Sequence, residues 1–404
     1  MKVGEVLNGY RISTAPTNNG GGMSQWSFAE KDGRQYFVKM FLAPKFPLPD
    51  GPGSETAKAR KRDVCMKFER RHLEIASRLD PSEPGGGNLV IPCDFFRVDS
   101  TYVKVMERVE AEALPPANRL TGHQLVVILR TLMFSLRLLH DKNVVHADVK
   151  PDNVLLKRST DDIYVSKLID FDEAYVVGDP PLPEHIVGDP VYYAPELLRY
   201  IKQDETLPPD ALATSADIFS LGLLVHTWLV GDVPDFDRSL AKYPAEALLG
   251  GQTLDVSAAP PAIRTLLARM VALRPFDRPT IREVIDFLAD VDPNSLVPTS
   301  APVERVRPAL PDSSASVHGE PARGGPPVPP ATGPRPAVGG SGSAGRAESR
   351  ATGAPELRWS TSEKASRGRP GARPAPPKPE GGSGLRSTMG RKRSAPPTEP
   401  PPTG

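Results

Sequence analysis

A change in composition near residue 293 sets the main limit on what this chain of 404 residues can fold into. Residues 301–404 hold 21 Pro and 16 Gly, and Trp359 is the only Phe, Trp or Tyr among them. Such a segment cannot bury enough apolar surface to offset the entropy lost when it is ordered. We therefore expect a folded part up to about residue 293 and a disordered, Pro/Gly-rich tail over 294–404.

The two parts also differ in charge. Residues 301–404 carry 16 Lys/Arg against 8 Asp/Glu, whereas residues 1–300 carry 34 against 41. An acidic folded part argues against nucleic-acid binding. The basic tail is suited to acidic partners, and its Pro-rich runs are suited to partners that recognise a polyproline helix, although a solubilising linker has the same composition.

Cysteine content and apolar runs bear on the cellular compartment. Cys65 and Cys93 form neither a disulfide framework nor a metal-binding spacing, which favours the reducing cytoplasm. The longest apolar run, residues 218–230, is shorter than the roughly 20 residues that cross a bilayer, so we expect no membrane span.

Hydrophobic periodicity indicates an α+β fold with two lobes. Residues 1–109 are expected to form a small lobe of antiparallel strands with one helix, and residues 110–293 a larger, mainly helical lobe. The expected strands are 10–14, 26–29, 35–41, 89–96 and 101–107. The expected helices are 54–79, 121–141, 216–230, 261–272 and 280–288.

Three motifs follow one another in the second lobe. Residues 145–156 read Val-His-Ala-Asp-Val-Lys-Pro-Asp-Asn-Val-Leu-Leu, residues 168–172 read Leu-Ile-Asp-Phe-Asp, and residues 188–196 end in Ala-Pro-Glu. In this order they resemble the catalytic loop, the metal-binding triplet and the Ala-Pro-Glu element of eukaryotic-like serine/threonine protein kinases, as found in bacteria. The resemblance covers about residues 5–290 and implies a bilobal fold with ATP between the lobes.

The resemblance implies specific roles for four residues. Asp148 would accept the proton of the substrate hydroxyl, and Lys150 would reach the transferred phosphate and mark serine/threonine specificity. Asn153 and Asp170 would bind Mg²⁺, or Mn²⁺, through oxygen atoms. Turn formation is the alternative explanation for each aspartate taken alone.

The residues that would contact ATP match the family less closely. Gly21, Gly22, Ser24 and Trp26 fall in the glycine-rich phosphate loop, where Asn19 and Ser24 replace two glycines and Trp26 replaces a valine. Lys39 would pair with the α- and β-phosphates. The resemblance places the hinge that meets the adenine at Met106, Glu107 and Val109.

The helix glutamate that should pair with Lys39 has two candidates. Glu69 shares a helix face with Leu73 and Ala76, and we prefer it to Glu74. Five further matches are expected to stabilise the large lobe rather than to catalyse: His146, Phe171, Glu196, Asp217 and Arg278.

Three residues depart from the family. Ala147 replaces an arginine that captures a phosphate on the activation segment in many members, so activity should not require phosphorylation there. Asp172 replaces the glycine of the metal-binding triplet, and either restricts backbone motion or adds a metal ligand. Asp189 replaces a threonine, and either pairs with Lys150 or repels Asp148.

These residues predict a protein serine/threonine kinase, including possible autophosphorylation, for example at Ser394 within its basic cluster. The departures leave open a pseudokinase that binds partners through the same fold. A small-molecule phosphotransferase is the third possibility, which the Ala-Pro-Glu element disfavours. The protein substrate is not indicated by the sequence.

Overall fold

The structure is a computed structural model, and it describes residues 1–18, 24–80, 82, 86–159, 163–208 and 210–297. All of these belong to one compact unit. The predicted phosphate-loop residues Gly21 and Gly22 lie outside the described residues, as does the predicted tail from residue 298 onward.

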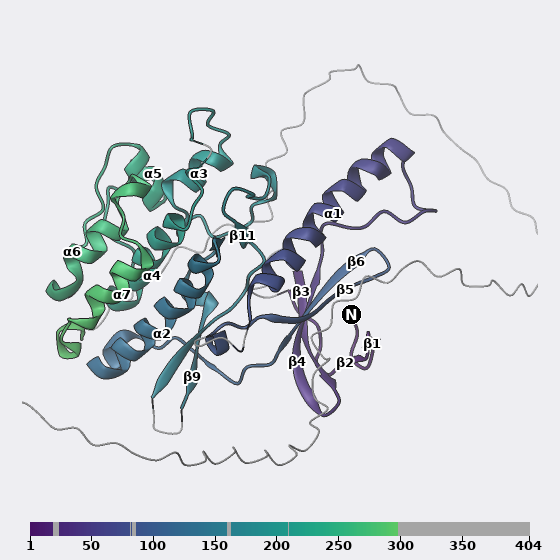
Figure 1. The fold of residues 1–404 in the computed structure, drawn as a ribbon, viewed down its shortest axis with the longest axis horizontal. Helices are drawn as coiled ribbons and strands as arrows, with labels where there is room; N and C mark the ends of the chain where they lie inside the picture. Colours follow the sequence, from purple (N-terminus) through teal and green to yellow (C-terminus); the bar gives the residue numbers. More distant parts are fainter. Residues whose placement is uncertain (19–23, 81, 83–85, 160–162, 209, 298–404) are drawn as a thin grey trace, which may run out of the picture. The chain divides into compact units, whose positions relative to one another are not determined.

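The small lobe is built on an antiparallel sheet of six strands in the order β1-β2-β3-β4-β6-β5 (Figure 1). The expected hairpin is present at Asp32 and Gly33, whose φ angles of 51° and 72° suit a tight turn between β3 and β4. The strands are β1 (Val6–Leu7), β2 (Tyr10–Ile12), β3 (Ser24–Lys31), β4 (Arg34–Phe41), β5 (Pro92–Val98) and β6 (Thr101–Glu107).

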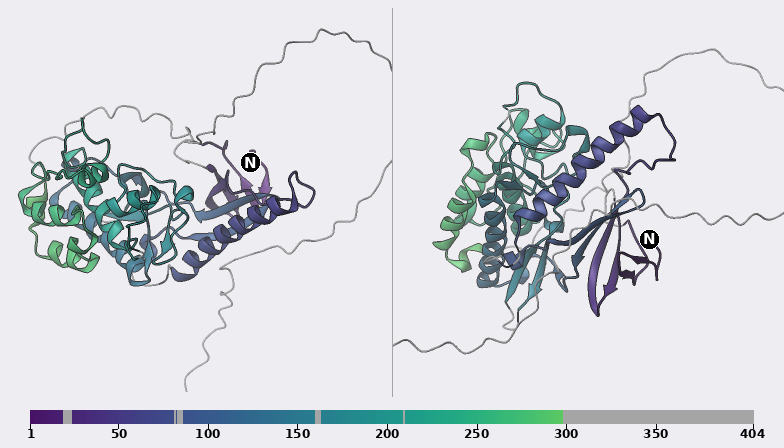
Figure 2. Two further views of the ribbon diagram at one scale, coloured as in Figure 1. Left: turned by 90° about the horizontal axis from the view of Figure 1, so that it is seen from above. Right: turned by 45° about the vertical axis from the view of Figure 1, so that its right-hand side comes forward.

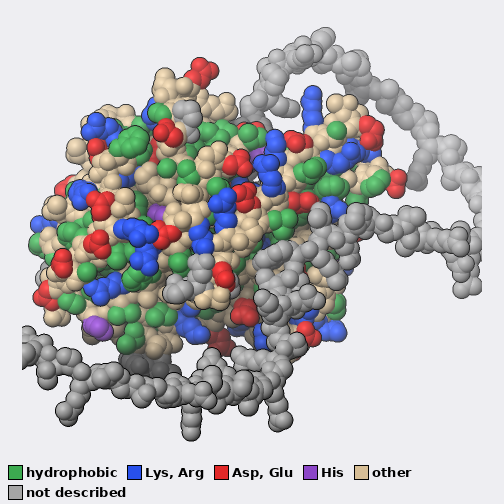
Figure 3. Space-filling model, in the orientation of Figure 1, with side chains coloured by type: hydrophobic (Ala, Val, Ile, Leu, Met, Phe, Trp, Pro, Cys, Tyr) green, Lys and Arg blue, Asp and Glu red, His purple; other side chains and the backbone are tan. Residues whose placement is uncertain are grey.

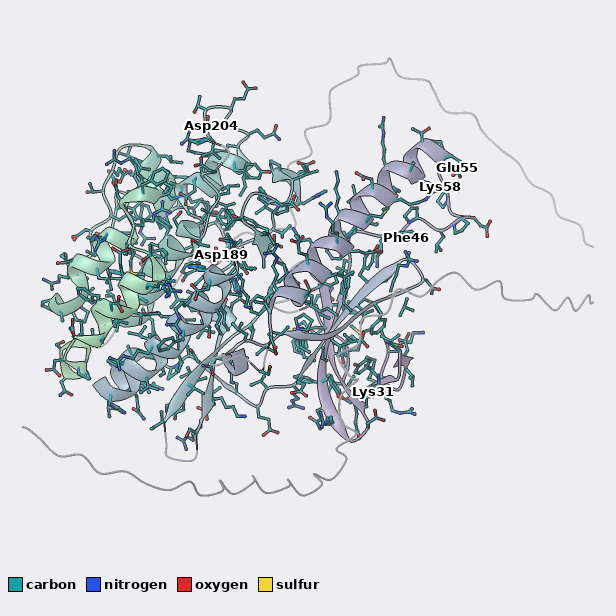
Figure 4. The ribbon with its side chains drawn as sticks, viewed as in Figure 1. Lys31, Phe46, Glu55, Lys58, Asp189 and Asp204 are labelled. Carbon is teal, nitrogen blue, oxygen red and sulfur yellow. The ribbon has the colours of Figure 1, made fainter. Side chains whose placement is uncertain are left out.

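Helix α1 (Glu55–Arg78) packs against this sheet through an aromatic cluster. Phe68 of the helix lies 5.1 Å from the ring of Phe41 and 5.1 Å from that of Tyr102. The helix begins at Ser54, whose side chain accepts a hydrogen bond from the backbone N–H of Ala57. Its first turns extend past the sheet (Figures 1 and 2), where Glu55 and Lys58 form an ion pair of 3.3 Å (Figure 4).

The large lobe is mainly helical, as expected. Helix α2 (Gly122–Asp141) starts with a capping box between Thr121 and Gln124. By length and composition it could cross a bilayer, but about half of it is buried in the core of this lobe, as in the core helix of a soluble protein. The other helices are α3 (Pro195–Ile201), α4 (Ser215–Val230), α5 (Pro244–Leu249), α6 (Pro261–Met270) and α7 (Ile281–Ala289).

Two small sheets at the edge of the large lobe carry the segments with the motifs. One has the order β10-β9-β7, and the other pairs β11 with β8. Their strands are β7 (Glu112–Ala113), β8 (Val144–Val145), β9 (Val154–Arg158), β10 (Tyr164–Leu168) and β11 (Tyr175–Val176). These strands and helices α3 and α5 were not expected from the sequence, because their apolar runs are too short for periodicity to reveal.

The chain stays packed slightly beyond residue 293. A 3₁₀ turn at Pro293–Leu296 places Leu296 in the core of the large lobe with 0% of its surface exposed. The turn lies so close to α2 that a Cβ atom on Gly122 would approach the carbonyl oxygen of Pro293 to 2.2 Å. Gly122 is therefore the residue that lets this end of the chain dock.

The two-lobed α+β architecture predicted from the sequence is thus confirmed. Acidic and basic side chains are interspersed over the face shown in Figure 3, so this face carries mixed charge.

Candidate active site

The loop after β8 carries the catalytic motif, and Asp217 of helix α4 holds this loop by hydrogen bonds. The buried carboxylate of Asp217 accepts hydrogen bonds from the backbone N–H groups of His146 and Ala147 at 2.8 and 2.9 Å. It also lies 3.0 Å from Nε2 of His140. Ala147 has a positive φ of 63°, a conformation that a non-glycine residue adopts only when its surroundings impose it. Asp217 supplies that constraint, in agreement with its predicted structural role.

Two polar side chains of the loop, those of Lys150 and Asn153, contact the carboxylate of Asp148. Nζ of Lys150 lies 2.8 Å from Oδ2 of Asp148. Nδ2 of Asn153 donates to the same oxygen at 2.8 Å and to the backbone carbonyl of Asp148 at 2.8 Å. Burial lowers the pKa of Lys150, but the charges of Asp148, Asp189 and Asp170 outweigh it, and the net pKa is raised. The site therefore presents an oriented carboxylate beside a cation that stays charged.

Lys39 joins the two lobes through Asp170, which follows β10. Nζ of Lys39 donates to both carboxylate oxygens of Asp170, at 3.1 and 2.9 Å. Asp170 has a φ of 64°, and the ring of Phe171 beside it lies tilted against that of His146, with 5.0 Å between the ring centroids. Lys39, Asp148, Lys150 and Asp170 all line one cavity of about 540 Å³. The structure thus brings together the predicted phosphate-binding, catalytic and metal-binding residues.

The predicted pairing of Glu69 with Lys39 is wrong. Glu69 accepts a hydrogen bond from the hydroxyl of Tyr102 at 2.6 Å and lies 3.9 Å from Arg97, while its competitor Glu74 pairs with Arg78 at 2.8 Å. The ion pairs of Lys39 among the described residues are with Asp170 and Asp172 instead.

The second carboxylate on Lys39 comes from Asp172, with Oδ2 at 2.6 Å from Nζ. The other oxygen of Asp172 is bound by Lys104 of β6. Burial alone would raise the pKa of Asp172, but Lys104 and Lys39 reverse this and hold it well below its usual range. Burial and the neighbouring Asp172 raise the pKa of Asp170. Asp172 is therefore held in its ionised form by two lysines, one at each of its oxygens.

Two α1 side chains reach this cluster: Arg71 donates to the backbone carbonyl of Asp172 at 2.9 Å, and His72 lies beside its carboxylate. Nε2 of His72 lies 3.9 Å from Oδ1 of Asp172, and the His72 ring stacks on Phe95 at 5.0 Å. Burial, with the charge of Lys104 second, lowers the pKa of His72 well below its usual range. The helix thus contributes a neutral aromatic ring here instead of a carboxylate.

Aromatic side chains form the cleft face of β3 and β4. Trp26 is paired in register with Lys39, and its ring stacks on Phe37 at 5.3 Å. Phe37 is in turn paired in register with Met106, the buried residue of the predicted hinge. Ser24 is buried at the start of β3, and of the other predicted hinge residues Glu107 is exposed and Val109 is half-buried.

Asp189 lies on the segment before α3 (Figure 4). Its Oδ1 accepts a hydrogen bond from the backbone N–H of Val191 at 3.0 Å, so the side chain caps its own turn. Asp189 contributes to the raised pKa of Lys150 without forming an ion pair with it among the described contacts. Of the two roles considered for Asp189, attraction to Lys150 is therefore the better supported.

Glu196 and Arg278 form the buried pair expected from the Ala-Pro-Glu element. Nη1 and Nη2 of Arg278 contact the two oxygens of Glu196 at 2.6 and 2.8 Å, and Arg278 also donates to the carbonyl of Ala272 at 2.9 Å. This geometry is bidentate and holds α3 to the segment that precedes α7.

The donor set suits a hard divalent cation that arrives with its substrate. Asp170 offers carboxylate oxygens, and Asn153 has its side-chain oxygen left because its Nδ2 is bound to Asp148. Within the described ranges, no group of three His, Cys, Asp or Glu side chains could hold a metal without further ligands. A cation that takes one or two protein oxygens and completes its shell with phosphates and water fits this arrangement.

The family model described as "protein kinase domain" matches residues 60–287, more than half of the chain. A serine/threonine-protein kinase named dkf-2 from Caenorhabditis briggsae is 33% identical over 209 residues, which is 50% of this chain and 15% of that protein.

Two further relatives are also named as serine/threonine-protein kinases. Human serine/threonine-protein kinase D3 is 32% identical over 40% of this chain and 17% of its own length. A probable serine/threonine-protein kinase of Saccharomyces cerevisiae, RTK1, is 25% identical over 73% of this chain and 47% of its own length. The chain therefore spans well under half of the length of the first curated relatives it matches.

Sequence reasoning missed Lys104, His72 and Phe37. The signal for Lys104 was its place in the apolar run Tyr-Val-Lys-Val-Met at 102–106, because a lysine inside a buried strand needs an acidic partner. The signal for Phe37 was the strand alternation that puts it on the same side as Lys39.

Proposed function

Because the chain belongs to the protein kinase family, we propose that it transfers the γ-phosphate of Mg²⁺-bound ATP to serine or threonine hydroxyls of protein substrates. The observation that carries the proposal is the arrangement at Asp148, where Lys150 and Asn153 both lie 2.8 Å from one carboxylate oxygen. Phosphoryl transfer needs a positioned acceptor hydroxyl and neutralised phosphate charge, with little covalent chemistry from the protein.

Each polar residue has one task in this proposal. Asp148 accepts the hydroxyl proton, and Lys150 stabilises the charge on the transferred group. Asn153 and Asp170 would hold the Mg²⁺, or Mn²⁺, which would supply positive charge to neutralise the phosphates. Lys39 supplies a buried cation toward the other phosphates.

The same proposal assigns the nucleotide to the face of β3, β4 and the hinge. Trp26, Phe37 and Met106 present apolar surface there, and the backbone of Glu107 and Val109 would meet the base edge. The unpaired thiols of Cys65 and Cys93 suit an enzyme that works in the reducing cytoplasm. The basic tail would recruit acidic or polyproline-recognising partners, and Ser394 is a candidate autophosphorylation site.

The test is transfer of labelled phosphate from Mg²⁺·ATP to a generic basic protein, with phosphoamino-acid analysis of the product. We expect phosphoserine or phosphothreonine from the wild type and none from Asp148→Asn. Asp152→Asn is the matched control, because it makes the same chemical change on an exposed side chain of the same loop. Equal transfer by wild type and Asp148→Asn would defeat the assignment of Asp148.

A pseudokinase is the second candidate, and two observations favour it: Asp189 stands where a threonine is expected, and both carboxylates near Lys39 are already bound to it. Binding of ATP by calorimetry, with no transfer to any acceptor or to itself, would make this the better function.

A further inference from the structure

Lys39 and Lys104 occupy directly opposed positions on neighbouring strands. They are partners in the register of β4 and β6, so their side chains leave the sheet on the same side. Both are buried, with 8% and 3% of their surface exposed. Like charges directly opposite each other destabilise a sheet, and a buried charge is costly without a partner. Both lysines therefore require negatively charged partners close to their ammonium groups.

Asp172 is the residue that contacts both. One of its oxygens lies 2.6 Å from Nζ of Lys39, and the other is bound by Nζ of Lys104. Asp170 adds the second negative charge on Lys39 at 2.9 Å. Two lysines and two aspartates thus make a cluster without net charge. Each oxygen of Asp172 thus has a lysine partner.

Helix α1 supplies no carboxylate to this cluster. Its contacts with Asp172 are a hydrogen bond from Arg71 to the backbone carbonyl at 2.9 Å and the approach of His72 to the carboxylate at 3.9 Å. Nε2 of His72 is buried without a hydrogen-bond partner. The helix is held to the sheet by ring contacts instead, with Phe41 5.4 Å and Phe95 5.0 Å from the imidazole. The orientation of Lys39 therefore depends on β6 and on the segment after Asp170, not on a carboxylate from α1.

We propose that Asp172, held by Lys104, is the positioning residue that orients Lys39 toward the phosphates of the nucleotide, in the role for which a glutamate of α1 was expected. The proposal rests on the function proposed above. Lys39 has three N–H donors, and it contacts two oxygens of Asp170 and one of Asp172. A phosphate oxygen would take the place of one of the two Asp170 oxygens, while the contact with Asp172 remains. In this arrangement the lysine is already oriented without any inward movement of α1.

The first test measures ATP affinity and steady-state kinetics of Asp172→Asn. The substitution keeps the size of the side chain and removes its charge, so Lys39 loses one of its two ionic partners. We expect the dissociation constant of Mg²⁺·ATP to rise and kcat/KM to fall by at least about tenfold, the scale of one charged hydrogen bond. If Glu69→Gln lowers kcat/KM as much as Asp172→Asn does, the proposal is wrong.

Rescue gives the sharper result, because it distinguishes positioning from general damage. His72→Glu would place a carboxylate on α1 next to Lys104 and Asp172, so we expect Asp172→Asn/His72→Glu to recover most of the lost ATP affinity. Asp172→Asn/His72→Gln is the matched control, with the same shape and no charge, and should recover none. Equal recovery by both variants, or recovery by neither, would overturn the proposal.

A readout without nucleotide separates this inference from the kinase proposal. Urea unfolding of Lys39→Met, Asp172→Asn and the double variant should be non-additive, because both single changes remove the same contact. Additive shifts would overturn the inference even if the wild type transfers phosphate. Absence of transfer by the wild type would defeat the kinase proposal, while non-additive unfolding with weakened ATP binding would still support Asp172 as the partner of Lys39.

Discussion

The ammonium group of Lys150 lies 2.8 Å from Oδ2 of Asp148, and both side chains are largely buried at the cavity that also holds Asp170. We predict that Lys150→Met lowers kcat roughly 100- to 1000-fold, as loss of one charge-stabilising donor does in other enzymes, with a smaller change in the KM for ATP. Steady-state kinetics measure this. Lys157→Met is the control, because Lys157 is an exposed lysine on β9. A change confined to KM would contradict the assigned role.

Activity should be independent of phosphorylation on the segment between Asp172 and the Ala-Pro-Glu element. Residues 173–193 contain no Ser or Thr, and their three tyrosines are buried, with 1%, 3% and 8% of the surface exposed at Tyr175, Tyr192 and Tyr193. Ala147 also offers no cation for a phosphate there. We expect phosphatase treatment of the purified protein to leave kcat/KM unchanged, with mass spectrometry to confirm removal of phosphate. Loss of activity after treatment would refute this.

Breaking the buried pair of Glu196 and Arg278 should cost stability. Glu196→Gln leaves the buried guanidinium of Arg278 without its counter-charge, so we expect the free energy of unfolding to fall by about 3–5 kcal/mol. Urea unfolding at neutral pH measures it. Glu196→Gln/Arg278→Met removes both charges and should be less destabilised than Glu196→Gln alone. A single variant as stable as wild type would show that the pair is not structural.

The raised pKa of Glu173 should make the free energy of unfolding depend on pH. The carboxyl of Glu173 is held near the backbone N–H of Val187, and burial raises its pKa from 4.5 to about 7. The folded protein therefore binds this proton more tightly than the unfolded chain, and stability falls as the pH rises from 4.5 to about 7. The full effect is at most about 3 kcal/mol. Glu173→Gln should remove this part of the curve, and parallel curves for both proteins would contradict the prediction.

Trp26 should contribute to nucleotide affinity by stacking. It is partly exposed on the cleft face and already stacked on Phe37. Aromatic stacking on a base is worth about 1–3 kcal/mol, so we expect Trp26→Ala to raise the dissociation constant of ATP about tenfold or more. Trp26→Phe keeps a ring and should lose much less. Calorimetric titration of both variants decides, and equal losses would exclude stacking.

The sequence was most informative where chemistry demands fixed spacing. The order Asp148, Lys150, Asn153 lies within six residues of one loop, so their meeting follows from the local chain. Glu196 and Arg278 were also paired correctly over a long separation, because each belongs to a motif that is specific by itself.

It was least informative where a partner had to be chosen between segments. Helical periodicity fixes the faces of α1 but not its rotation against the sheet, and this is why Glu69 was preferred although it points at Tyr102. Asp172 left two roles open for a related reason. Only the register of β4 and β6 shows that Lys39 and Lys104 share one side of the sheet.

Because Lys39 and Lys104 are paired in register and both depend on acidic partners, substitutions in this cluster should be linked in evolution. Replacement of Asp172 by glycine would leave two buried lysines to share Asp170, while loss of Lys104 would free one oxygen of Asp172 in a buried position. Neither residue can change first without a penalty, so Lys104 and Asp172 should be retained or lost together across descendants of this chain. A related chain that has one of the two residues should therefore have the other. A lysine at the position of Lys104, in the strand before the hinge, would then mark sites in which no glutamate of the helix pairs with the β4 lysine.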